Sequence, residues 1–314
     1  MTKIGFLFPG QGAQFVGMGR DLYEQVPQAK AVYDRADAVL GYALSKICFE
    51  GPEDELTRTL NAQPAIYVTS LAALAALRAR IPDIQPVFAA GLSLGEWSAL
   101  AALNALDWEE GLRLVQIRAQ AMEKSAQARP GTMASVLGLP ASDCDLAARE
   151  AGCEVANLNS PDQTVLSGTV ESIQKLIGVA EGMGAKKVFP LKVGGAFHSS
   201  LMSEARGILS QALQRVQIKS PSAVFIPNAA ARPVSDTEEI RNLLAAQVTS
   251  PVRWVETMNA AAGSGAGLFL EIGPGKVLKG LARKCVAGLA VEPCGTVEDI
   301  DKAAGLLSVQ NVKK

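Results

Sequence analysis

Histidine is almost absent from the sequence, since His198 is the single one among 314 residues. One imidazole excludes the multi-histidine sites that many metalloenzymes use, and we expect no bound metal. The five cysteines are an odd number, and no two of them form a C-x-x-C pair. The sequence therefore predicts neither a disulfide framework nor a zinc ribbon, and free thiols favour a cytoplasmic location.

Charge of one sign, aromatic side chains and long apolar runs are also scarce. The formal net charge is −1 and aromatic residues make up 5% of the chain, so neither nucleic acid nor an anionic membrane surface is an expected partner. The richest apolar stretch, residues 70–77, ends at Arg78. It is shorter than the roughly 20 residues of a membrane-spanning helix, and the apolar run near the first residue is too short for a signal peptide.

What is present is the composition of a globular protein with a sizeable core. Hydrophobic residues make up 48% of the chain and charged residues 19%, which excludes a mainly disordered protein. Strand-sized apolar runs, as at residues 4–8 and 86–90, alternate with helix-sized segments such as 63–80 and 108–125. This alternation predicts an α/β domain with a mostly parallel sheet.

The pattern changes after residue 129. From there to residue 192 the sequence indicates a strand, a helix, two strands around an Asn-Ser-Pro-Asp turn, a second helix and a last strand. The order βαββαβ is typical of a ferredoxin-like domain. We therefore predict a large α/β domain formed by residues 1–129 and 193–314, into which a small ferredoxin-like domain of residues 130–192 is inserted.

The strongest chemical signal is the pentapeptide Gly91-Leu92-Ser93-Leu94-Gly95. It is a G-x-S-x-G motif between an expected strand and an expected helix, which is the setting of a nucleophile elbow. In such an elbow the serine occupies a strained turn at a helix N-terminus, where backbone N–H groups stabilise developing negative charge. The alternative is a serine that caps a helix beside a glycine turn.

A nucleophilic serine needs a base, and a serine–histidine pair in this chain can only join Ser93 to His198. The alternative for His198 is a solvated or helix-capping histidine. Arg118 lies among apolar positions of an expected helix. It is a candidate for a bidentate clamp on a substrate carboxylate, and the alternative is an arginine that is salt-bridged or whose end reaches solvent.

Seven short segments, spread over nearly the whole chain, form a further pattern. They are Phe8-Pro9-Gly10-Gln11-Gly12-Ala13-Gln14, Ser93-Leu94-Gly95-Glu96, Arg118, Asn157-Leu158-Asn159-Ser160-Pro161, Ala196-Phe197-His198-Ser199, Gln247 before Ser250-Pro251-Val252, and Glu271-Ile272-Gly273-Pro274-Gly275. In this order they resemble the malonyl-CoA:acyl-carrier-protein transacylases, which are related to the acyltransferase domains of fatty acid and polyketide synthases. The resemblance implies a hydrolase-like α/β core with a ferredoxin-like small domain.

The resemblance also implies a role for each matching residue. Ser93 resembles the nucleophile that takes up the acyl group, and His198 resembles the general base. The backbone N–H groups of Gln11 and Leu94 resemble an oxyanion hole. Gln247 resembles the residue whose backbone carbonyl orients the histidine, which explains why the sequence shows no persuasive triad aspartate.

Three positions bear on the choice of acyl group. Arg118 resembles the residue that pairs with the malonyl carboxylate. Phe197 before His198 resembles malonyl-type members, because methylmalonyl-selecting domains tend to carry a serine there. Leu92 occupies the position before the nucleophile, where the family usually has a histidine. A leucine cannot hydrogen-bond, so this departure concerns the rate and the fine acyl preference.

The activity implied by the resemblance is ping-pong transfer of malonyl from malonyl-CoA to the phosphopantetheine thiol of an acyl carrier protein, for fatty acid biosynthesis. We expect a monomer that uses no metal or redox cofactor. One alternative is an acyltransferase for another carrier, in a polyketide or malonate decarboxylase system. The others are a serine thioesterase or hydrolase, which would not need Arg118, and a non-catalytic scaffold.

Basic side chains are candidates for docking the carrier. Carrier proteins are usually acidic, so a locally basic surface would attract them. The alternative is a solvated face that binds nothing. The candidate residues are Lys186, Lys187, Lys276, Lys279, Arg283 and Lys284.

Overall fold

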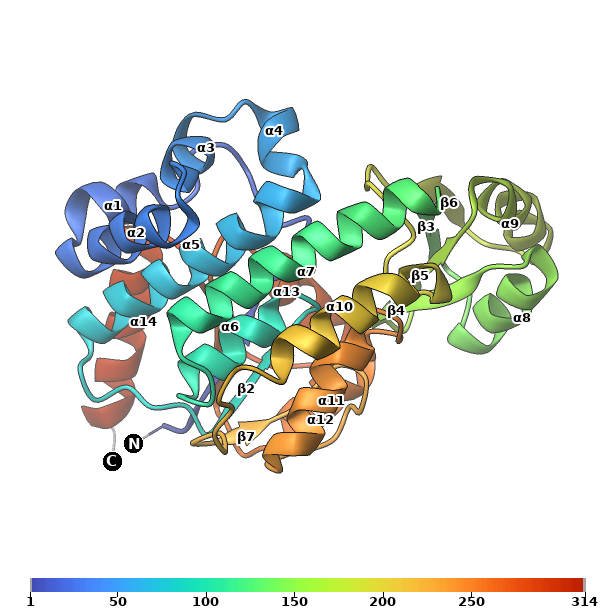
Figure 1. Cartoon of the computed structure of the whole chain (residues 1–314). Coiled ribbons are helices and arrows are strands. Elements are labelled where there is room, and N and C mark those ends of the chain that lie inside the picture. Colours follow the sequence, from blue (N-terminus) through green and yellow to red (C-terminus); the bar gives the residue numbers. More distant parts are fainter. Residues whose placement is uncertain (1, 313–314) are drawn as a thin grey trace.

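Two β-sheets organise the protein, which we describe for residues 2–312 from a computed structural model (Figure 1). The first sheet has five parallel strands in the order β7-β2-β1-β8-β9. The expected mostly parallel sheet is therefore confirmed. The strand bounds are β1 Ile4–Phe8, β2 Phe88–Gly91, β7 Val224–Phe225, β8 Leu268–Ile272 and β9 Val291–Cys294.

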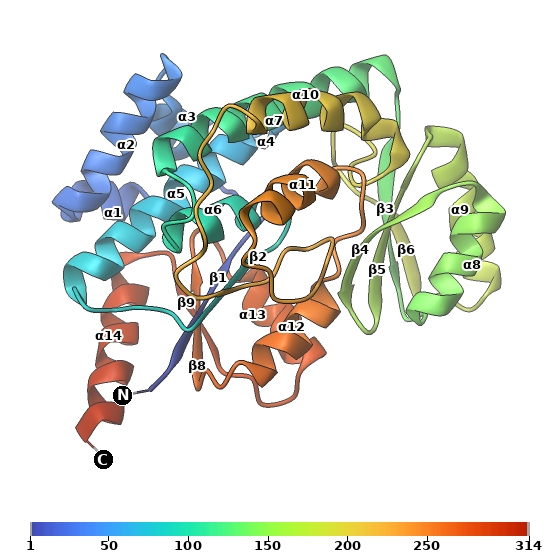
Figure 2. The same cartoon turned by 60° about the horizontal axis from the view of Figure 1, so that its bottom comes forward.

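Helices surround this sheet and cover both of its faces (Figure 2). In chain order they are α1 Arg20–Gln25, α2 Pro27–Leu40, α3 Leu44–Glu50, α4 Glu53–Thr57, α5 Thr59–Arg80, α6 Gly95–Ala102, α7 Trp108–Ala128, α10 Ser203–Leu213, α11 Thr237–Gln247, α12 Trp254–Gly263, α13 Val277–Cys285 and α14 Val297–Val312. A short 3-10 turn at Ser200–Met202 precedes α10.

Strand β1 runs through the middle of the sheet and is buried on both faces. Successive side chains of a strand point to opposite faces. Phe6 and Phe8 accordingly join the apolar cluster that includes α5, α6 and α7. Leu7 joins a second cluster with α12 and α13. The continuous apolar run that predicted a buried strand thus serves two cores at once.

Helix α5 is longer than expected, because it begins at Thr59 rather than near residue 63. Its length and composition would suffice to cross a membrane, so our expectation that no segment reaches that length is wrong. The apolar run of residues 70–77 is only part of this helix, whose first half is also apolar and buried. In the structure 83% of its most apolar 18-residue window is buried, as in the core helix of a globular domain.

The second sheet is antiparallel, with the order β4-β5-β3-β6. Helices α8 and α9 pack on it around a third apolar cluster. This strand order and the chain order βαββαβ are those of a ferredoxin-like fold, so the expected fold class is confirmed. The division of the chain at residues 130 and 192 stays a prediction. The bounds are β3 Thr132–Leu137, α8 Ala141–Ala151, β4 Glu154–Ser160, β5 Gln163–Gly168, α9 Val170–Gly182 and β6 Lys187–Pro190.

Two connections hold the sheets together. Helix α7 packs along α5 and leads within a few residues into β3 (Figure 1). Val252, after α11, pairs with β4: it accepts a hydrogen bond from the Leu158 amide at 2.9 Å and donates one to the Ala156 carbonyl at 2.8 Å. The small sheet therefore lies beside the carboxyl ends of β1 and β2, which is where parallel sheets place their ligands.

Candidate active site

A cavity of about 370 Å³ lies between the two sheets. Its walls come from the segments that follow β1 and β2, from α7 and from the antiparallel sheet. Five of the six residues that the sequence singled out line it, and the sixth, Gln247, is buried behind them. The five are Gln11, Ser93, Leu94, Arg118 and His198.

Ser93 occupies a sharp turn between β2 and α6. Its φ of 51° is a left-handed conformation that is uncommon for a residue other than glycine. The flanking glycines leave no room for side chains. A Cβ on Gly91 would lie 1.9 Å from the carbonyl carbon of Gly95, and a Cβ on Gly95 would lie 2.1 Å from the carbonyl oxygen of Phe8. The turn therefore has the geometry of a nucleophile elbow.

His198 connects Ser93 to Gln247. The Ser93 Oγ lies 2.8 Å from His198 Nε2, and Nδ1 lies 2.9 Å from the backbone oxygen of Gln247. A carbonyl oxygen only accepts, so Nδ1 carries the proton and donates, while Nε2 presents its lone pair to the serine. This is the tautomer that a general base requires.

Burial and a nearby positive charge keep this histidine neutral. Both desolvation and the Arg118 guanidinium lower the pKa of His198 from 6.5 to about 4. Burial lowers the pKa of Arg118 to about 10, so the arginine stays protonated near neutral pH. At pH 7 the site therefore holds a neutral imidazole, free to accept the proton of Ser93, beside a cation.

Arg118 extends from α7 and is only 1% exposed, which contradicts the solvent-reaching alternative. Its Nη2 donates to Ser93 Oγ at 3.0 Å and to Gln247 Oε1 at 2.9 Å, and its Nη1 donates to Gln63 Oε1 at 2.5 Å. Within the described chain its Nε has no hydrogen-bond partner. Because Arg118 lines the cavity, its buried positive charge is suited to an anionic ligand there.

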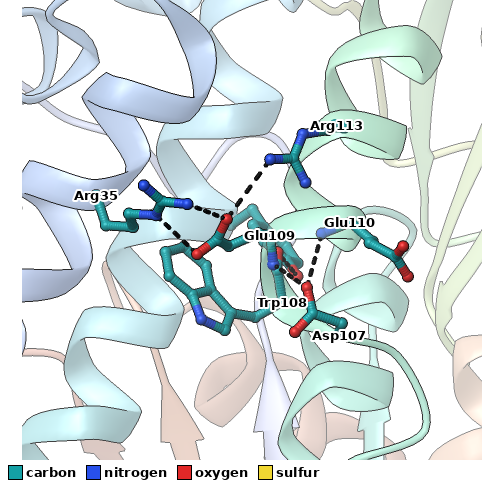
Figure 3. Close-up of polar contacts among 7 residues, drawn as sticks. Arg35, Asp107, Trp108, Glu109, Glu110 and Arg113 are labelled. Atoms are coloured by element: carbon teal, nitrogen blue, oxygen red, sulfur yellow. Dashed lines mark hydrogen bonds and ion pairs between the residues drawn. The ribbon is translucent and has the colours of Figure 1, made fainter.

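Polar contacts at the start of α7 fix the helix that carries this arginine (Figure 3). The Asp107 carboxylate accepts hydrogen bonds from the amides of Glu109 and Glu110, each at 3.0 Å, and so caps the helix. Glu109 accepts two hydrogen bonds from Arg35 of α2, at 2.8 and 2.9 Å, and lies 3.5 Å from Arg113. These contacts anchor α7 to α2.

Two backbone amides beside Ser93 have the properties of an oxyanion hole. Gln11 follows β1, Leu94 is the N-cap residue of α6, and both line the cavity. In the described part of the chain neither amide donates a backbone hydrogen bond. Unpaired N–H groups next to the serine are suited to stabilise negative charge on a tetrahedral intermediate.

Three buried polar residues around the site were given no role by the sequence analysis. Gln63 accepts from Arg118, Asn228 contacts the turn at Ser93, and Glu96 is fully buried with a pKa raised to about 7 by burial. For Glu96 a signal existed, because an acid between a glycine and a tryptophan in an apolar helix indicates a buried carboxyl. No local signal marks Asn228.

Other parts of the described chain offer less chemistry. A cavity of about 480 Å³ at the other end of α5 is lined by no serine, histidine or cysteine. Among residues 2–312 no group of three or more histidine, cysteine or acidic side chains is placed to hold a metal ion. All five cysteines are free thiols. The cavity at Ser93 is therefore the candidate active site.

Comparison with known proteins agrees with this site. Residues 5–306 match the acyl transferase domain family. The chain is 42% identical to the malonyl CoA-acyl carrier protein transacylase of Bacillus subtilis over 316 residues, 99% of each chain. It is similar to the structure of the acyl-carrier-protein-S-malonyltransferase of Bartonella henselae, with a TM-score of 0.93, 38% identity and coverage of 98% and 99%.

A further solved structure is a malonyl-transacylase in complex with its type II PKS acyl-carrier protein. Its TM-score to this chain is 0.93 at 32% identity, with coverage of 97% of this chain and 100% of that one. The likeness thus extends over both sheets and over every segment that forms the cavity. The chain belongs to the acyl transferase family, among the malonyl-CoA–acyl carrier protein transacylases.

Proposed function

We propose that the protein transfers a malonyl group from malonyl-CoA to the phosphopantetheine thiol of an acyl carrier protein, through an ester on Ser93. The observation that carries the proposal is the Ser93 hydroxyl, which contacts both the neutral His198 imidazole and the buried Arg118 guanidinium. The names of the relatives support the malonyl donor. The complex of a relative with its acyl-carrier protein supports the acceptor.

The first half of the reaction forms the ester. His198 Nε2 takes the proton of the Ser93 hydroxyl while Oγ attacks the thioester carbonyl carbon. The amides of Gln11 and Leu94 stabilise the negative oxygen of the tetrahedral intermediate, a contribution of about 3–4 kcal/mol for one good donor. The intermediate then breaks its carbon–sulfur bond, and the departing CoA thiolate receives the proton from His198.

The second half reverses these steps with a different thiol. The phosphopantetheine thiol of the carrier gives its proton to His198, and its sulfur attacks the ester carbonyl on Ser93. The carbon–oxygen bond of the ester breaks, and Ser93 recovers a proton from His198. Protons and acyl group balance over the two halves, so the thioester itself supplies the activation and we propose no metal or redox cofactor.

Arg118 would select the malonyl group through its second carboxylate. That carboxylate would pair with the buried guanidinium, which lines the cavity beside Ser93. An acetyl group would instead leave the buried donor unpaired beside a methyl group, which costs about 1–3 kcal/mol. The same requirement favours a malonyl transferase over a general serine esterase.

The cellular role and the oligomeric state of the protein form a separate part of the proposal. We propose that the enzyme supplies malonyl carriers to fatty acid synthesis in the cytoplasm, and its five free thiols support a reducing compartment. We also propose that it acts as a monomer, because residues of one chain surround the cavity.

The test is intact-protein mass spectrometry after brief mixing with malonyl-CoA, with acetyl-CoA and the Ser93→Ala variant in parallel. We expect a malonyl adduct on the wild-type protein and none on the variant, and discharge of that adduct when a phosphopantetheinylated carrier is added. Loss of the adduct to water without transfer would indicate a thioesterase. The absence of any adduct on a folded protein would contradict the proposal and favour a scaffold.

A further inference from the structure

Asn228 holds the turn at Ser93 from both sides. Its Oδ1 accepts a hydrogen bond from the Ser93 amide at 2.6 Å, and its Nδ2 donates to the Gly91 carbonyl at 2.7 Å. The side chain is fully buried, so water does not compete for these bonds. A carboxamide offers one acceptor and one donor at this spacing, whereas a carboxylate offers only acceptors.

Glu96 connects Asn228 to Gln247. Its Oε2 accepts from the Asn228 backbone amide at 3.1 Å and from Gln247 Nε2 at 2.5 Å. The same Nε2 also donates to the Ser93 carbonyl at 2.9 Å. One buried carboxyl therefore joins the residue that clamps the serine turn to the residue whose backbone carbonyl accepts from His198.

The orientation of the Gln247 amide follows from its two neighbours. Its oxygen accepts from the Arg118 guanidinium, and its nitrogen faces the Glu96 carboxyl. A flip of the amide would place an NH₂ group against the guanidinium and an oxygen against the carboxyl oxygen. Both contacts would be lost in a buried place, where an unmade hydrogen bond is costly.

From these contacts we infer that Glu96 and Asn228 are positioning residues for acyl transfer, which hold the Ser93 turn and Gln247 so that the Ser93 hydroxyl faces His198 Nε2. The inference rests on the proposed function of this site. Neither residue contacts the reacting oxygen or the imidazole. Both residues hold the turn through hydrogen bonds: the two donors to Glu96 are neutral N–H groups, and its carboxyl also interacts with the charge of Arg118.

The inference predicts that the near-isosteric substitution is tolerated at Glu96 and is not tolerated at Asn228. In Glu96→Gln the amide oxygen accepts both hydrogen bonds and activity is kept, whereas Glu96→Ala lowers kcat by about 100-fold, the effect of a small misplacement of reacting groups. Asn228→Asp keeps the acceptor for Ser93 but sets an oxygen against the Gly91 carbonyl. We therefore expect it to lose about as much activity as Asn228→Ala.

The readout is the rate at which phenylmethylsulfonyl fluoride modifies Ser93, followed by intact mass, together with kcat and KM for malonyl-CoA. In the modification Ser93 Oγ bonds to sulfur, fluoride leaves and His198 takes the proton. The reagent carries no malonyl group, so it reports on the pair of Ser93 and His198 even if the proposed substrate is wrong. Loss of positioning lowers this rate and kcat together, with little change in KM.

Glu271→Ala is the matched control, because Glu271 is also a fully buried carboxyl that accepts from two amides, those of Leu278 and Lys279, each at 2.8 Å. We expect it to lower the unfolding temperature and leave the modification rate of Ser93 unchanged. The inference is overturned if Glu96→Ala reacts at the wild-type rate, or if Glu96→Gln is as slow as Glu96→Ala. If the alanine variants do not fold, the near-isosteric Glu96→Gln and Asn228→Asp decide: equal modification rates contradict the inference.

Discussion

Ser93 and His198, 105 positions apart in sequence, both adopt left-handed backbone conformations, with φ of 51° and 59°, at the two ends of one 2.8 Å hydrogen bond. Such conformations cost on the order of 1–3 kcal/mol for a non-glycine residue. The surroundings of each residue hold it in place: Asn228 clamps the serine turn, and Gln247 holds the imidazole. Nucleophile and base are thus set before substrate arrives.

The pH dependence of Ser93 modification should reveal the environment of His198. Burial and the charge of Arg118 lower the pKa of His198 to about 4, so the imidazole remains an acceptor in mild acid. We expect the rate of modification by phenylmethylsulfonyl fluoride to fall by half near this pKa rather than near 6.5. Rates measured across this range on folded protein check the prediction, and a midpoint near 6.5 would contradict it.

Thermal unfolding is less suited to measuring the pKa of His198. Protonation of His198 and protonation of Glu96 change the free energy of unfolding in opposite directions. Between about pH 4 and pH 6.5 the unfolded chain binds a proton at His198 more readily than the folded chain does. The folded state is therefore destabilised relative to the unfolded state as pH falls through this range. Burial raises the pKa of Glu96 from 4.5 to about 7. The contribution of Glu96 to the free energy of unfolding is therefore lost as pH rises from about 4.5 to about 7. Modification rates measured in parallel on Glu96→Gln, which has no carboxyl to titrate at this position, separate the titration of His198 from that of Glu96.

Replacement of Arg118 by alanine should reduce the preference for malonyl-CoA over acetyl-CoA. Loss of one partner of a buried, hydrogen-bonded charge pair costs about 2–5 kcal/mol, which lowers kcat/KM for malonyl-CoA by roughly 30-fold or more. Acetyl-CoA has no carboxylate, so its turnover loses only the contacts that Arg118 makes within the protein, with Ser93, Gln247 and Gln63. The measurement is the ratio of kcat/KM for the two donors.

A second arginine of α7 supplies the control for this ratio. Arg113 is half-exposed and lies 3.5 Å from Glu109 near the start of the helix (Figure 3). Arg113→Ala should leave the donor ratio as it is, and Arg118→Lys should restore only part of it because an ammonium lacks the planar fork. A donor ratio that does not move in Arg118→Ala would exclude this arginine from malonyl selection.

The sequence predicted those features whose signals are local. The G-x-S-x-G turn lies beside a recognisable strand, and a single histidine leaves one choice of partner for Ser93. The βαββαβ order likewise follows from short-range patterns.

Leu92 occupies the position where the family usually has a histidine, and the structure shows what its backbone does there. Its backbone amide donates to the Phe8 carbonyl and its carbonyl accepts from the Gly95 amide, both at 3.0 Å. These backbone bonds shape the turn whatever the side chain.

The sequence could not predict contacts that depend on distant segments. Asn228 is 135 positions from Ser93, and an asparagine in a loop carries no mark of its partner. The partners of the Arg118 guanidinium are equally invisible in the sequence, because they come from α5, from α11 and from the turn at Ser93. Long-range hydrogen bonds of common residue types were therefore the part of the site that only the structure could show.

Docking of the carrier should depend on basic residues that are not already paired. Lys279 lies 3.0 Å from Glu292, and Lys284 lies 3.2 Å from Asp162, so these two candidates have partners within the chain. Lys276 and Arg283 are exposed at the two ends of α13, a helix whose residues reach the cavity wall. We expect Lys276→Glu with Arg283→Glu to raise KM for an acidic carrier by about tenfold, since charges at the rim govern encounter.

The experiment starts from the preformed malonyl-enzyme, so that binding of the negatively charged CoA does not enter. Transfer to the carrier is followed at increasing carrier concentration and at two salt concentrations. Because exposed charges are screened by salt, the difference between the variant and the wild type should shrink at high salt. Arg215→Glu with Lys219→Glu, the same reversal of two charges on exposed residues that do not line the cavity, should leave transfer unchanged. An equal loss in both variants would show an effect of net charge alone and place the docking surface elsewhere.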